Sequence, residues 1–307
     1  MTWRVLITDG LAAPGRTVLE RQAELVSSGL EDAPRDVDAL IVRSRTQVTA
    51  GTLARCAPRL QVIGRAGVGV DNIDLQAAVD AGVIVVNAPE AASISVAEHT
   101  LALMLALARR IPQADASLRR GEWKKGELTG AELHGKTLGL IGLGRIGTLV
   151  AERATAFGMQ VLAFDPALSE EDIAARGACG TDFETVLEQA DVISLHVPLV
   201  PGTANLIDAQ TLGRMKPGAW LICTSRGGII DEGALANALQ DGTVAGAALD
   251  VFEHEPPGVN ALTALPNIVL TPHIAGQTEQ AQARVAVDIA SEVLRALRGE
   301  PLRWRVA

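Results

Sequence analysis

Short apolar segments alternate with stretches of helical spacing over the N-terminal third of the chain. The apolar segments are rich in Val, Ile and Leu, and strands are predicted at 4–8, 39–42, 60–63 and 83–86. Continuous apolar strands that alternate with helices are typical of a parallel sheet covered by helices on both faces. The pattern therefore predicts an α/β domain at the N-terminus.

A second series of apolar segments follows a long helix. The helix is predicted to start at Ser95 and to run through 108, because Ser95 and Glu98 have the spacing of a capping box and apolar residues follow them. This helix could cross between domains or form a dimer contact. The strands predicted after it lie at 137–141, 160–164, 192–196, 219–223, 244–249 and 268–271. Six strands with helices between them make a complete doubly wound sheet.

The last helical stretch, 279–298, lies after the second sheet is complete. We therefore expect it to return to the N-terminal domain, which makes that domain discontinuous. The predicted fold class is α/β, with two doubly wound parallel-sheet domains. Residues 1–90 plus 276–307 form the first domain, and residues 91–275 form a second domain inserted into it.

Composition and charge narrow the possible classes of protein. The 307 residues are 48% hydrophobic and 21% charged, which is ordinary for a globular protein with room for two cores. The formal net charge of -9 provides no general attraction for a phosphate backbone, so no nucleic-acid partner is expected. No apolar run is long enough for a signal peptide or a membrane span, so no membrane association is expected.

The three cysteines, Cys56, Cys179 and Cys223, are far apart and form no C-x-x-C motif. An odd and scattered set favours free thiols in a reducing compartment over a disulfide framework or a zinc site. We therefore expect a cytoplasmic protein without a bound metal.

A glycine motif follows the strand predicted at 137–141. Gly142, Gly144 and Gly147 have G-x-G-x-x-G spacing and open a helix, so the backbone can approach a pyrophosphate at the helix N-terminus. The next strand ends at Asp165, where a carboxylate can bind the adenosine ribose and would repel a 2′-phosphate. The pairing predicts NAD as the cofactor rather than NADP. The alternative is a tight strand-to-helix corner without a ligand.

A second glycine cluster, at 64–72, also follows a strand. It lacks the third glycine of the motif and an acidic strand end at the right distance, so no second nucleotide site is expected. The backbone N–H groups of Gly67, Val68 and Gly69 could form a nest for a substrate carboxylate. The alternative is a plain strand-to-helix turn.

Hydride transfer at a carbinol carbon needs a group that exchanges the hydroxyl proton and a cation that holds a carboxylate. Arg226 follows a buried strand and precedes two glycines, and its guanidinium fork fits a carboxylate. His273 ends the last strand, and Glu255 follows the strand before it. A carboxylate beside an imidazole orients the ring and stabilises its charged form. Each residue taken singly is also compatible with an ordinary hydrogen-bonding or surface role.

Four motifs in this order resemble the D-isomer-specific 2-hydroxyacid dehydrogenases. They are GLGRIG (142–147), RGGIIDE (226–232), DVFEHEP (250–256) and PHIAG (272–276). The resemblance implies that Arg226 binds and polarises the substrate, that His273 is the general acid/base, and that Glu255 supports it. It also implies a Rossmann-type NAD-binding domain at 91–275 inserted into a flavodoxin-like substrate-binding domain.

The same resemblance implies cofactor contacts on the glycine loop and at strand ends. Besides the three motif glycines, these are Val68, Arg145, Ile146, Asp165, Val197, Ser225, Asp250 and Gly276. Asp250 is expected near the nicotinamide amide, and His196 at the border of the adenine pocket. The remaining histidines, which are expected to be structural or solvated, are His99, His134 and His254.

The resemblance narrows to the phosphoglycerate dehydrogenase branch of the family and covers nearly the whole chain. The additional motifs are LIVRS (40–44), GRAGVGVDNID (64–74), ARRIPQA (108–114) and GKTLG (135–139). A phosphorylated substrate needs positive charge beyond Arg226, which Arg43 and Arg65 are expected to supply, the alternative being surface ion pairing. Lys125 matches a basic position that relatives extend into the neighbouring subunit, and a homodimer or homotetramer is expected.

Two features depart from that branch. Many of its members continue into regulatory domains, whereas this sequence ends at Ala307, so feedback through such a domain is not expected. Gln277 stands where relatives often have a small residue.

The resulting prediction is an NAD-dependent oxidation of 3-phospho-D-glycerate to 3-phosphohydroxypyruvate, the first step of serine synthesis. One alternative is a dehydrogenase for hydroxypyruvate, glyoxylate or another D-2-hydroxyacid pair. Another is an NADH-dependent binding protein similar to the C-terminal-binding corepressors, which keep the same fold and similar site residues. Formate dehydrogenases share the fold but carry Gln where Glu255 stands.

Overall fold

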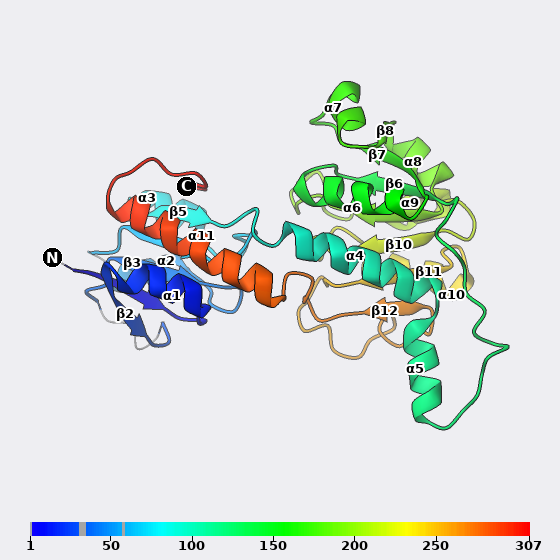
Figure 1. The fold of residues 1–307 in the computed structure, drawn as a ribbon, viewed down its shortest axis with the longest axis horizontal. Coiled ribbons are helices and arrows are strands. Elements are labelled where there is room, and N and C mark those ends of the chain that lie inside the picture. The colour runs from blue at the N-terminus through cyan, green and yellow to red at the C-terminus, as the bar shows by residue number, and fades with distance from the viewer. Residues whose placement is uncertain (1, 31–34, 57–58) are drawn as a thin grey trace. The chain divides into compact units, whose positions relative to one another are not determined.

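The computed structural model describes residues 2–30, 35–56 and 59–307. The chain divides into two compact units (Figure 1). Unit 1 consists of Met1–Ser93 with Gly276–Ala307, and unit 2 consists of Ile94–Ala275. The first division thus falls three residues after the one drawn from the sequence pattern.

Unit 1 contains a five-stranded parallel sheet in the order β2-β1-β3-β4-β5, which is the flavodoxin-type strand order. The strands are β1 (Trp3–Ile7), β2 (Ala23–Ser27), β3 (Ala39–Val42), β4 (Val62–Arg65) and β5 (Ile84–Asn87). The hydrophobic pattern does not predict β2, because this edge strand exposes Glu24 and Ser27 and has no continuous apolar run.

Helices cover both faces of this sheet. They are α1 (Ala13–Glu20), α2 (Ala50–Cys56), α3 (Leu75–Asp80) and α11 (Glu279–Leu297). Leu19 of α1 and Ile289 of α11 belong to one core cluster, whereas Leu53 of α2 and Ala78 of α3 belong to the cluster on the opposite face. The last helix of the chain therefore completes the core of the N-terminal unit.

Unit 2 contains a seven-stranded sheet in the order β12-β11-β10-β9-β6-β7-β8, with all neighbouring strands parallel. The strands are β6 (Thr137–Ile141), β7 (Gln160–Phe164), β8 (Cys179–Gly180), β9 (Val192–Leu195), β10 (Trp220–Cys223), β11 (Gly246–Leu249) and β12 (Ile268–Leu270). This is the Rossmann strand order extended by one strand at the β12 edge. The predicted pair of doubly wound parallel sheets is confirmed, although β8 is too short for the pattern to predict.

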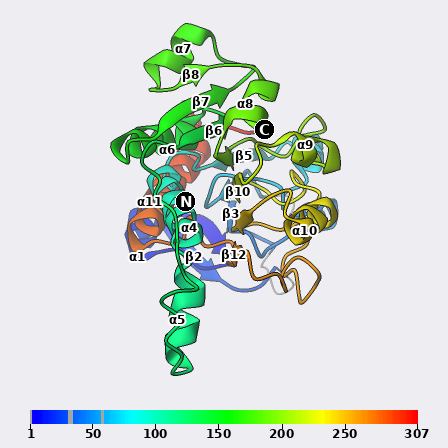
Figure 2. The same cartoon turned by 90° about the vertical axis from the view of Figure 1, so that its right-hand side faces the viewer.

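The helices of unit 2 also pack on both faces of its sheet. They are α4 (Ser93–Ala108), α5 (Ile111–Arg119), α6 (Arg145–Ala156), α7 (Glu170–Ala175), α8 (Phe183–Gln189), α9 (Ala209–Arg214) and α10 (Glu232–Asp241). Met104 of α4 and Val150 of α6 share one core cluster, and Leu187 of α8 and Leu235 of α10 share the other. α5 projects away from the sheet of this unit (Figures 1 and 2).

The start of α4 differs from the sequence prediction. The helix begins at Ser93, so Ser95 lies inside the first turn, buried, and the capping box expected at Ser95 and Glu98 is wrong. Glu98 instead lies 3.7 Å from Arg153, with which it forms an ion pair. Spacing alone did not distinguish a cap from a helical serine whose side chain is covered by the fold.

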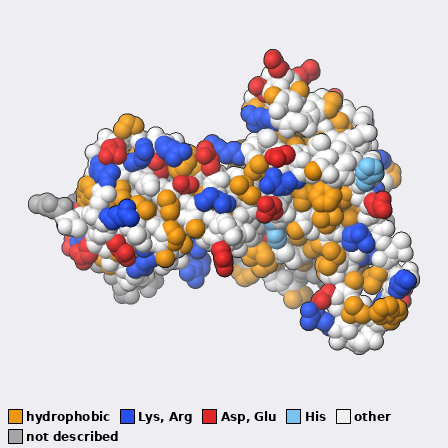
Figure 3. All heavy atoms as spheres, viewed as in Figure 1, with side chains coloured by type: hydrophobic (Ala, Val, Ile, Leu, Met, Phe, Trp, Pro, Cys, Tyr) orange, Lys and Arg blue, Asp and Glu red, His pale blue; other side chains and the backbone are white. Residues whose placement is uncertain are grey.

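The surface, the cysteines and the length of the helices add three further observations. Basic and acidic side chains are interspersed over the face of each unit drawn in Figure 3. Cys56 and Cys223 are buried free thiols and Cys179 is an exposed one. In the part of the chain that the structure describes, no helix is long and apolar enough to cross a bilayer.

Candidate active site

The three candidate catalytic residues follow neighbouring strands of unit 2. Arg226 follows β10, Glu255 lies in the loop after β11, and His273 follows β12. Backbone hydrogen bonds continue the pairing past the strands, because the Asp250 N–H donates to the Cys223 carbonyl at 2.9 Å and the His273 N–H to the Asp250 carbonyl at 2.8 Å. Ligands of open α/β sheets bind at this carboxyl edge.

The side chains of His273 and Glu255 are in direct contact. Nδ1 of His273 lies 2.8 Å from Oε2 and 3.1 Å from Oε1 of the carboxylate. The Phe252 N–H donates to Oε1 of Glu255 at 3.2 Å, so the backbone holds the carboxylate in place. Since an ionised carboxylate only accepts hydrogen bonds, Nδ1 carries the proton and Nε2 is the nitrogen that can exchange one with a substrate. Both side chains are partly exposed, at 47% and 38%.

A buried carboxylate holds the His273 loop. Asp250 is completely buried, and its Oδ1 accepts from the Ile274 N–H at 2.9 Å while its Oδ2 accepts from the Ala275 N–H at 2.8 Å. Thr271 donates its hydroxyl to Oδ1 at 2.6 Å. Burial disfavours the charged form of Asp250, but the nearby Nε2 of His99 and these hydrogen bonds outweigh it and lower the pKa of Asp250.

These contacts give Asp250 a supporting role in the loop that carries His273. The backbone of His273 has φ of 52°, a left-handed conformation that is unfavourable for a residue with a side chain. The hydrogen bonds to Asp250 therefore fix a strained loop at the point where the imidazole must be oriented. A contact between Asp250 and the cofactor stays a prediction of the resemblance.

Arg226 lies in a loop that packs against the loop of Glu255. A Cβ atom on Gly227 would lie 1.8 Å from the Phe252 carbonyl oxygen, so only glycine permits this approach. Nη1 of Arg226 donates to the carbonyl of Ser225 at 2.6 Å, which directs the guanidinium along its own loop. The close contact of the two loops explains the glycine that follows Arg226.

The glycine loop after β6 has the shape of a dinucleotide site. Gly142 has φ of +92°, and a Cβ atom there would lie 2.7 Å from the His196 carbonyl oxygen. A Cβ atom on Gly147 would lie 2.3 Å from the Gly142 carbonyl, whereas nothing lies within 4 Å of one on Gly144. Gly144 is the N-cap of α6, followed by Arg145. The space at this helix N-terminus fits an approaching pyrophosphate.

Asp165 is anchored above the glycine loop. Its Oδ2 accepts from the Leu143 N–H at 2.8 Å and its Oδ1 from the Ala167 N–H at 3.0 Å. The predicted ribose-binding carboxylate is thereby brought next to the predicted pyrophosphate loop. His196 borders the same loop, with Nε2 2.9 Å from the Ser194 hydroxyl. Burial lowers the pKa of His196 to about 4, so the ring is neutral at pH 7.

Arg43 in unit 1 is held by polar neighbours that the sequence did not predict as its partners. Its backbone N–H donates to Asp9 at 2.8 Å, and Nδ2 of Asn72 donates to its carbonyl at 2.7 Å. Nη2 of the guanidinium donates to Oε1 of Gln277 at 3.3 Å. Partial burial lowers the pKa of Arg43, and the nearby Asp9 opposes that shift. Gln277, which the sequence left unexplained, is thus a partner of Arg43.

The glycine cluster in unit 1 forms a tight turn. The Gly67 N–H donates to the Arg65 carbonyl at 2.8 Å, and a nest of Gly67, Val68 and Gly69 for a substrate carboxylate stays a prediction. The Arg65 side chain folds back over the same loop, with Nη1 3.3 Å from the Ala66 carbonyl. Positive charge therefore covers the position where the nest was expected.

Comparison with known proteins identifies the family. Residues 101–275 match the model of the D-isomer specific 2-hydroxyacid dehydrogenase NAD binding domain, which is more than half of the chain. The chain belongs to this family. The resemblance inferred from the four motifs is confirmed, and residues 101–275 form the family's NAD binding domain.

Curated relatives and solved structures support the same family. The chain is 48% identical over 304 residues to the D-3-phosphoglycerate dehydrogenase of Methanocaldococcus jannaschii, and 47% identical over 305 residues to that of Bacillus subtilis. These alignments cover 97% and 98% of this chain, but the chain spans only 58% of the length of each relative.

Two solved structures share the fold of this chain. A crystal structure from Thermus thermophilus is 36% identical with a TM-score of 0.88, covering 99% of this chain and 100% of that one. A D-lactate dehydrogenase from Aquifex aeolicus, solved as a complex with NAD and lactic acid, is 31% identical with a TM-score of 0.84, and 96% of each chain is covered.

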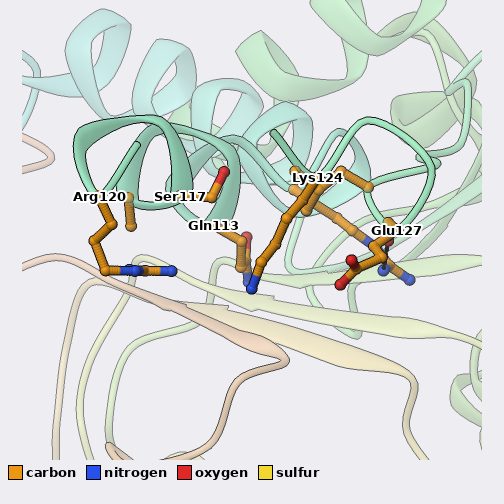
Figure 4. Close-up of a pocket in the computed structure, with 8 residues that line it drawn as sticks. Gln113, Ser117, Arg120, Lys124 and Glu127 are labelled. Atoms are coloured by element: carbon orange, nitrogen blue, oxygen red, sulfur yellow. Dashed lines mark hydrogen bonds between the residues drawn. The ribbon is translucent and has the colours of Figure 1, made fainter. Parts of the chain in front are cut away.

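A hollow in unit 2 lies beside α5, with a volume of about 380 Å³ (Figure 4). Arg120 and Lys124 border it, but both pair with Glu122, at 3.0 Å each, and these contacts lower the Glu122 pKa to about 2. Their charge is therefore partly neutralised. Lys125 is exposed and is not among the residues that line the hollow.

The described residues were also compared with the geometry that a metal site needs. Among residues 2–30, 35–56 and 59–307, no group of three or more His, Cys, Asp or Glu side chains is placed to hold a metal ion.

His99 and Thr271 contact each other behind the His273 loop at 3.0 Å. No local spacing signals this pair, because the two residues are 172 positions apart.

Proposed function

We propose that this 2-hydroxyacid dehydrogenase interconverts a D-2-hydroxy acid and its 2-keto acid with NAD, and that its substrate is 3-phospho-D-glycerate. The contact of 2.8 Å between His273 and Glu255 carries the proposal. An imidazole oriented by a carboxylate is suited to move a proton, and it lies at the carboxyl edge of a sheet that also carries a dinucleotide loop.

In the oxidation direction, Arg226 pairs with the substrate carboxylate through its planar guanidinium. Nε2 of His273 takes the hydroxyl proton, and Glu255 stabilises the imidazolium that results. In the reverse direction the same imidazolium returns the proton to the keto oxygen. NAD held by the glycine loop and Asp165 would supply the acceptor for the hydride of the carbinol carbon.

The glycine loop and Asp165 are the residues that we propose to hold the cofactor. The pyrophosphate would approach Gly142, Gly144 and Gly147 together with the first turn of α6 at Arg145 and Ile146, and Asp165 would accept from the ribose hydroxyls. The family resemblance adds a further set of contacts: Val68, Val197, Ser225, Asp250 and Gly276. The acidic strand end favours NAD over NADP because it would repel a 2′-phosphate.

The phosphate of the substrate is assigned to basic side chains outside the catalytic group. Arg43 and Arg65 are the proposed ligands, with Lys125 as a further cation. Support comes from the curated relatives named D-3-phosphoglycerate dehydrogenase, at 43–48% identity over nearly the whole chain. With this substrate the enzyme would catalyse the first step of serine synthesis, and its free cysteines suit the reducing conditions of the cytoplasm.

A substrate panel tests this proposal. NADH oxidation is measured with phosphohydroxypyruvate, hydroxypyruvate, glyoxylate and pyruvate for the wild type, Arg43→Ala and Arg65→Ala. We expect the highest kcat/KM with phosphohydroxypyruvate, and a loss in the two variants that is selective for that substrate. An equal loss across the panel, or none, would remove the phosphate assignment. NADH-dependent peptide binding without turnover would favour the corepressor-like alternative.

We also propose a homodimer formed through α4 and the α5 arm. Ile111 and Leu118 of α5 are 52% and 59% exposed, and Trp123 just beyond it is 81% exposed, which is unusual for large apolar side chains. Light scattering tests this, since the molar mass in solution should be twice that of the chain. A strict monomer would contradict it.

A further inference from the structure

Two consecutive polar residues of α4 reach the two catalytic loops of unit 2. Nε2 of His99 lies 3.0 Å from Oγ1 of Thr271, two residues before His273. Oγ1 of Thr100 lies 2.9 Å from Oγ1 of Thr224, two residues before Arg226. The first contact is partly buried, and the second lies in the interior of unit 2, where Thr100 is completely buried.

The direction of the hydrogen bonds in the first contact follows from Asp250. Thr271 donates its single hydroxyl hydrogen to the Asp250 carboxylate at 2.6 Å. Its oxygen must therefore accept from Nε2–H of His99, which fixes the tautomer of that ring. His99 also lies 3.6 Å from Oδ1 of Asp250. The chain of donors runs from His99 through Thr271 to the carboxylate.

That carboxylate is the anchor of the acid/base loop. Asp250 accepts from the N–H groups of Ile274 and Ala275, and its carbonyl accepts from the His273 N–H. Because the His273 backbone is in the left-handed region, the loop depends on these partners to keep its conformation. Loss of the His99 donor would leave Thr271 and Asp250 with one partner fewer in a buried site.

The second contact has its own fixed direction. Thr100 donates its hydroxyl to the Val96 carbonyl of the same helix at 2.8 Å. Its oxygen therefore accepts from the Thr224 hydroxyl, so that α4 holds the segment leading to Arg226. One turn of α4 thus contacts both the segment that leads to His273 and the segment that leads to Arg226.

We propose that His99 and Thr100 are positioning residues that set where the His273 imidazole and the Arg226 guanidinium stand in unit 2. The inference rests on the proposed function, which gives the two loops separate tasks. Weakening the His99 contact should act on proton transfer and lower kcat. Weakening the Thr100 contact should act on carboxylate binding and raise KM for the keto acid.

The experiment compares two pairs of variants with matched controls. His99→Leu removes the donor and His99→Gln keeps an N–H, while Thr100→Val removes the hydroxyl and Thr100→Ser keeps it. The controls are His134→Leu, at an exposed histidine of the same unit, and Thr155→Val, whose hydroxyl donates to the Ala151 carbonyl of its own helix. Thermal unfolding is measured for every variant.

We expect His99→Leu to lower kcat by about 10- to 100-fold, because displacement of a catalytic group by about 1 Å has an effect of that size. KM should change by less than about 2-fold, and His99→Gln should recover most of the kcat. Thr100→Val should raise KM by about 10-fold with a smaller change in kcat, and Thr100→Ser should recover it. Wild-type kinetics in both removal variants, or recovery by neither conservative variant, would overturn the proposal.

Amide hydrogen exchange separates this inference from the proposed function, because it needs no turnover. His99→Leu should accelerate exchange in peptides covering 271–277, and Thr100→Val in peptides covering 224–228, with the glycine loop at 142–147 unchanged. If the wild type reduces no keto acid, the proposed function fails and the exchange pattern alone decides the positioning role. Uniform acceleration over unit 2, or no acceleration, would overturn it.

Discussion

The loops of His273 in unit 2 and of Arg43 in unit 1 carry functional side chains in different ways. The His273 loop is tied by a fully buried carboxylate through hydrogen bonds of 2.6 to 2.9 Å. The Arg43 backbone is also held by hydrogen bonds, with Asp9 and Asn72, but its guanidinium makes an exposed contact of 3.3 Å to Gln277. Under the proposed function, the general acid/base would stand on a rigid loop, whereas the phosphate contact would depend on an adaptable cation.

The largest effect is expected from a substitution in the rigid His273 loop. His273→Ala should lower kcat by about 10²- to 10⁴-fold, because the general acid/base is lost. NADH oxidation with the best keto acid of the panel measures the effect, and NADH affinity by fluorescence titration should stay within about 2-fold of wild type. Turnover close to wild type would remove His273 from the mechanism.

Acid should lower the free energy of unfolding of the protein through His196 in unit 2. In the unfolded chain its imidazole takes up a proton near pH 6.5, whereas in the folded state burial lowers its pKa to about 4. The unfolded state therefore binds more protons between these values, so stability falls as the pH is lowered through this window. The loss should reach about 3 kcal/mol at the acid end.

Denaturant unfolding at pH 7 and pH 5 measures this dependence. His196→Gln removes the titrating group and should flatten the curve over that range, while His134→Leu, at an exposed histidine, should leave it unchanged. An identical slope in wild type and His196→Gln would mean that other groups cause the dependence.

Arg43→Ala tests whether the Arg43 guanidinium binds the phosphate of the substrate. Loss of a charged hydrogen bond to phosphate should raise KM for phosphohydroxypyruvate by about 10- to 100-fold and leave that for hydroxypyruvate nearly unchanged. Arg45→Ala is a matched control, since this exposed arginine is two residues away and its closest carboxylate contact, with Asp9, is 3.9 Å. The same rise in KM in both variants would indicate a general electrostatic attraction of the substrate rather than a contact between Arg43 and the phosphate.

The smallest expected effect concerns Gln277. Because its contact with Arg43 is exposed and long, Gln277→Ala should raise KM for the phosphorylated substrate by only about 2- to 5-fold, with kcat unchanged. Arg43→Ala combined with Gln277→Ala should be no worse than Arg43→Ala alone. A double variant that loses the product of both effects would show that Gln277 acts independently of Arg43.

The sequence predicts the main sheets well and the edges poorly. Buried strands such as β6 and β10 carry continuous apolar runs, whereas β2 exposes Glu24 and β8 has only two residues. The capping box at Ser95 was wrong because serine and glutamate at that spacing also occur inside a helix. Apolar runs along the sequence indicate buried segments. They are weak at the edge strands of a sheet and at the ends of helices, where burial is incomplete.

The candidate site shows a similar limit. Glu255 and His273, which the motifs single out, are in contact, and Asp165 does lie at the glycine loop. The roles of His99 and Gln277 depend on partners more than 170 positions away, which no spacing indicates. The hydrogen bond of the Gly67 N–H within its own loop is likewise not visible in the spacing of the glycines.

Transfer of a deuterium label tests the central claim most directly. Wild-type protein is incubated with NADH deuterated at its transferable position and with phosphohydroxypyruvate, and the product is analysed by mass spectrometry and chiral chromatography. We predict D-3-phosphoglycerate with one deuterium on the carbinol carbon, and almost none of it with His273→Ala. Absence of labelled hydroxy acid with every keto acid of the panel would contradict the assignment of this chain as a hydride-transferring enzyme.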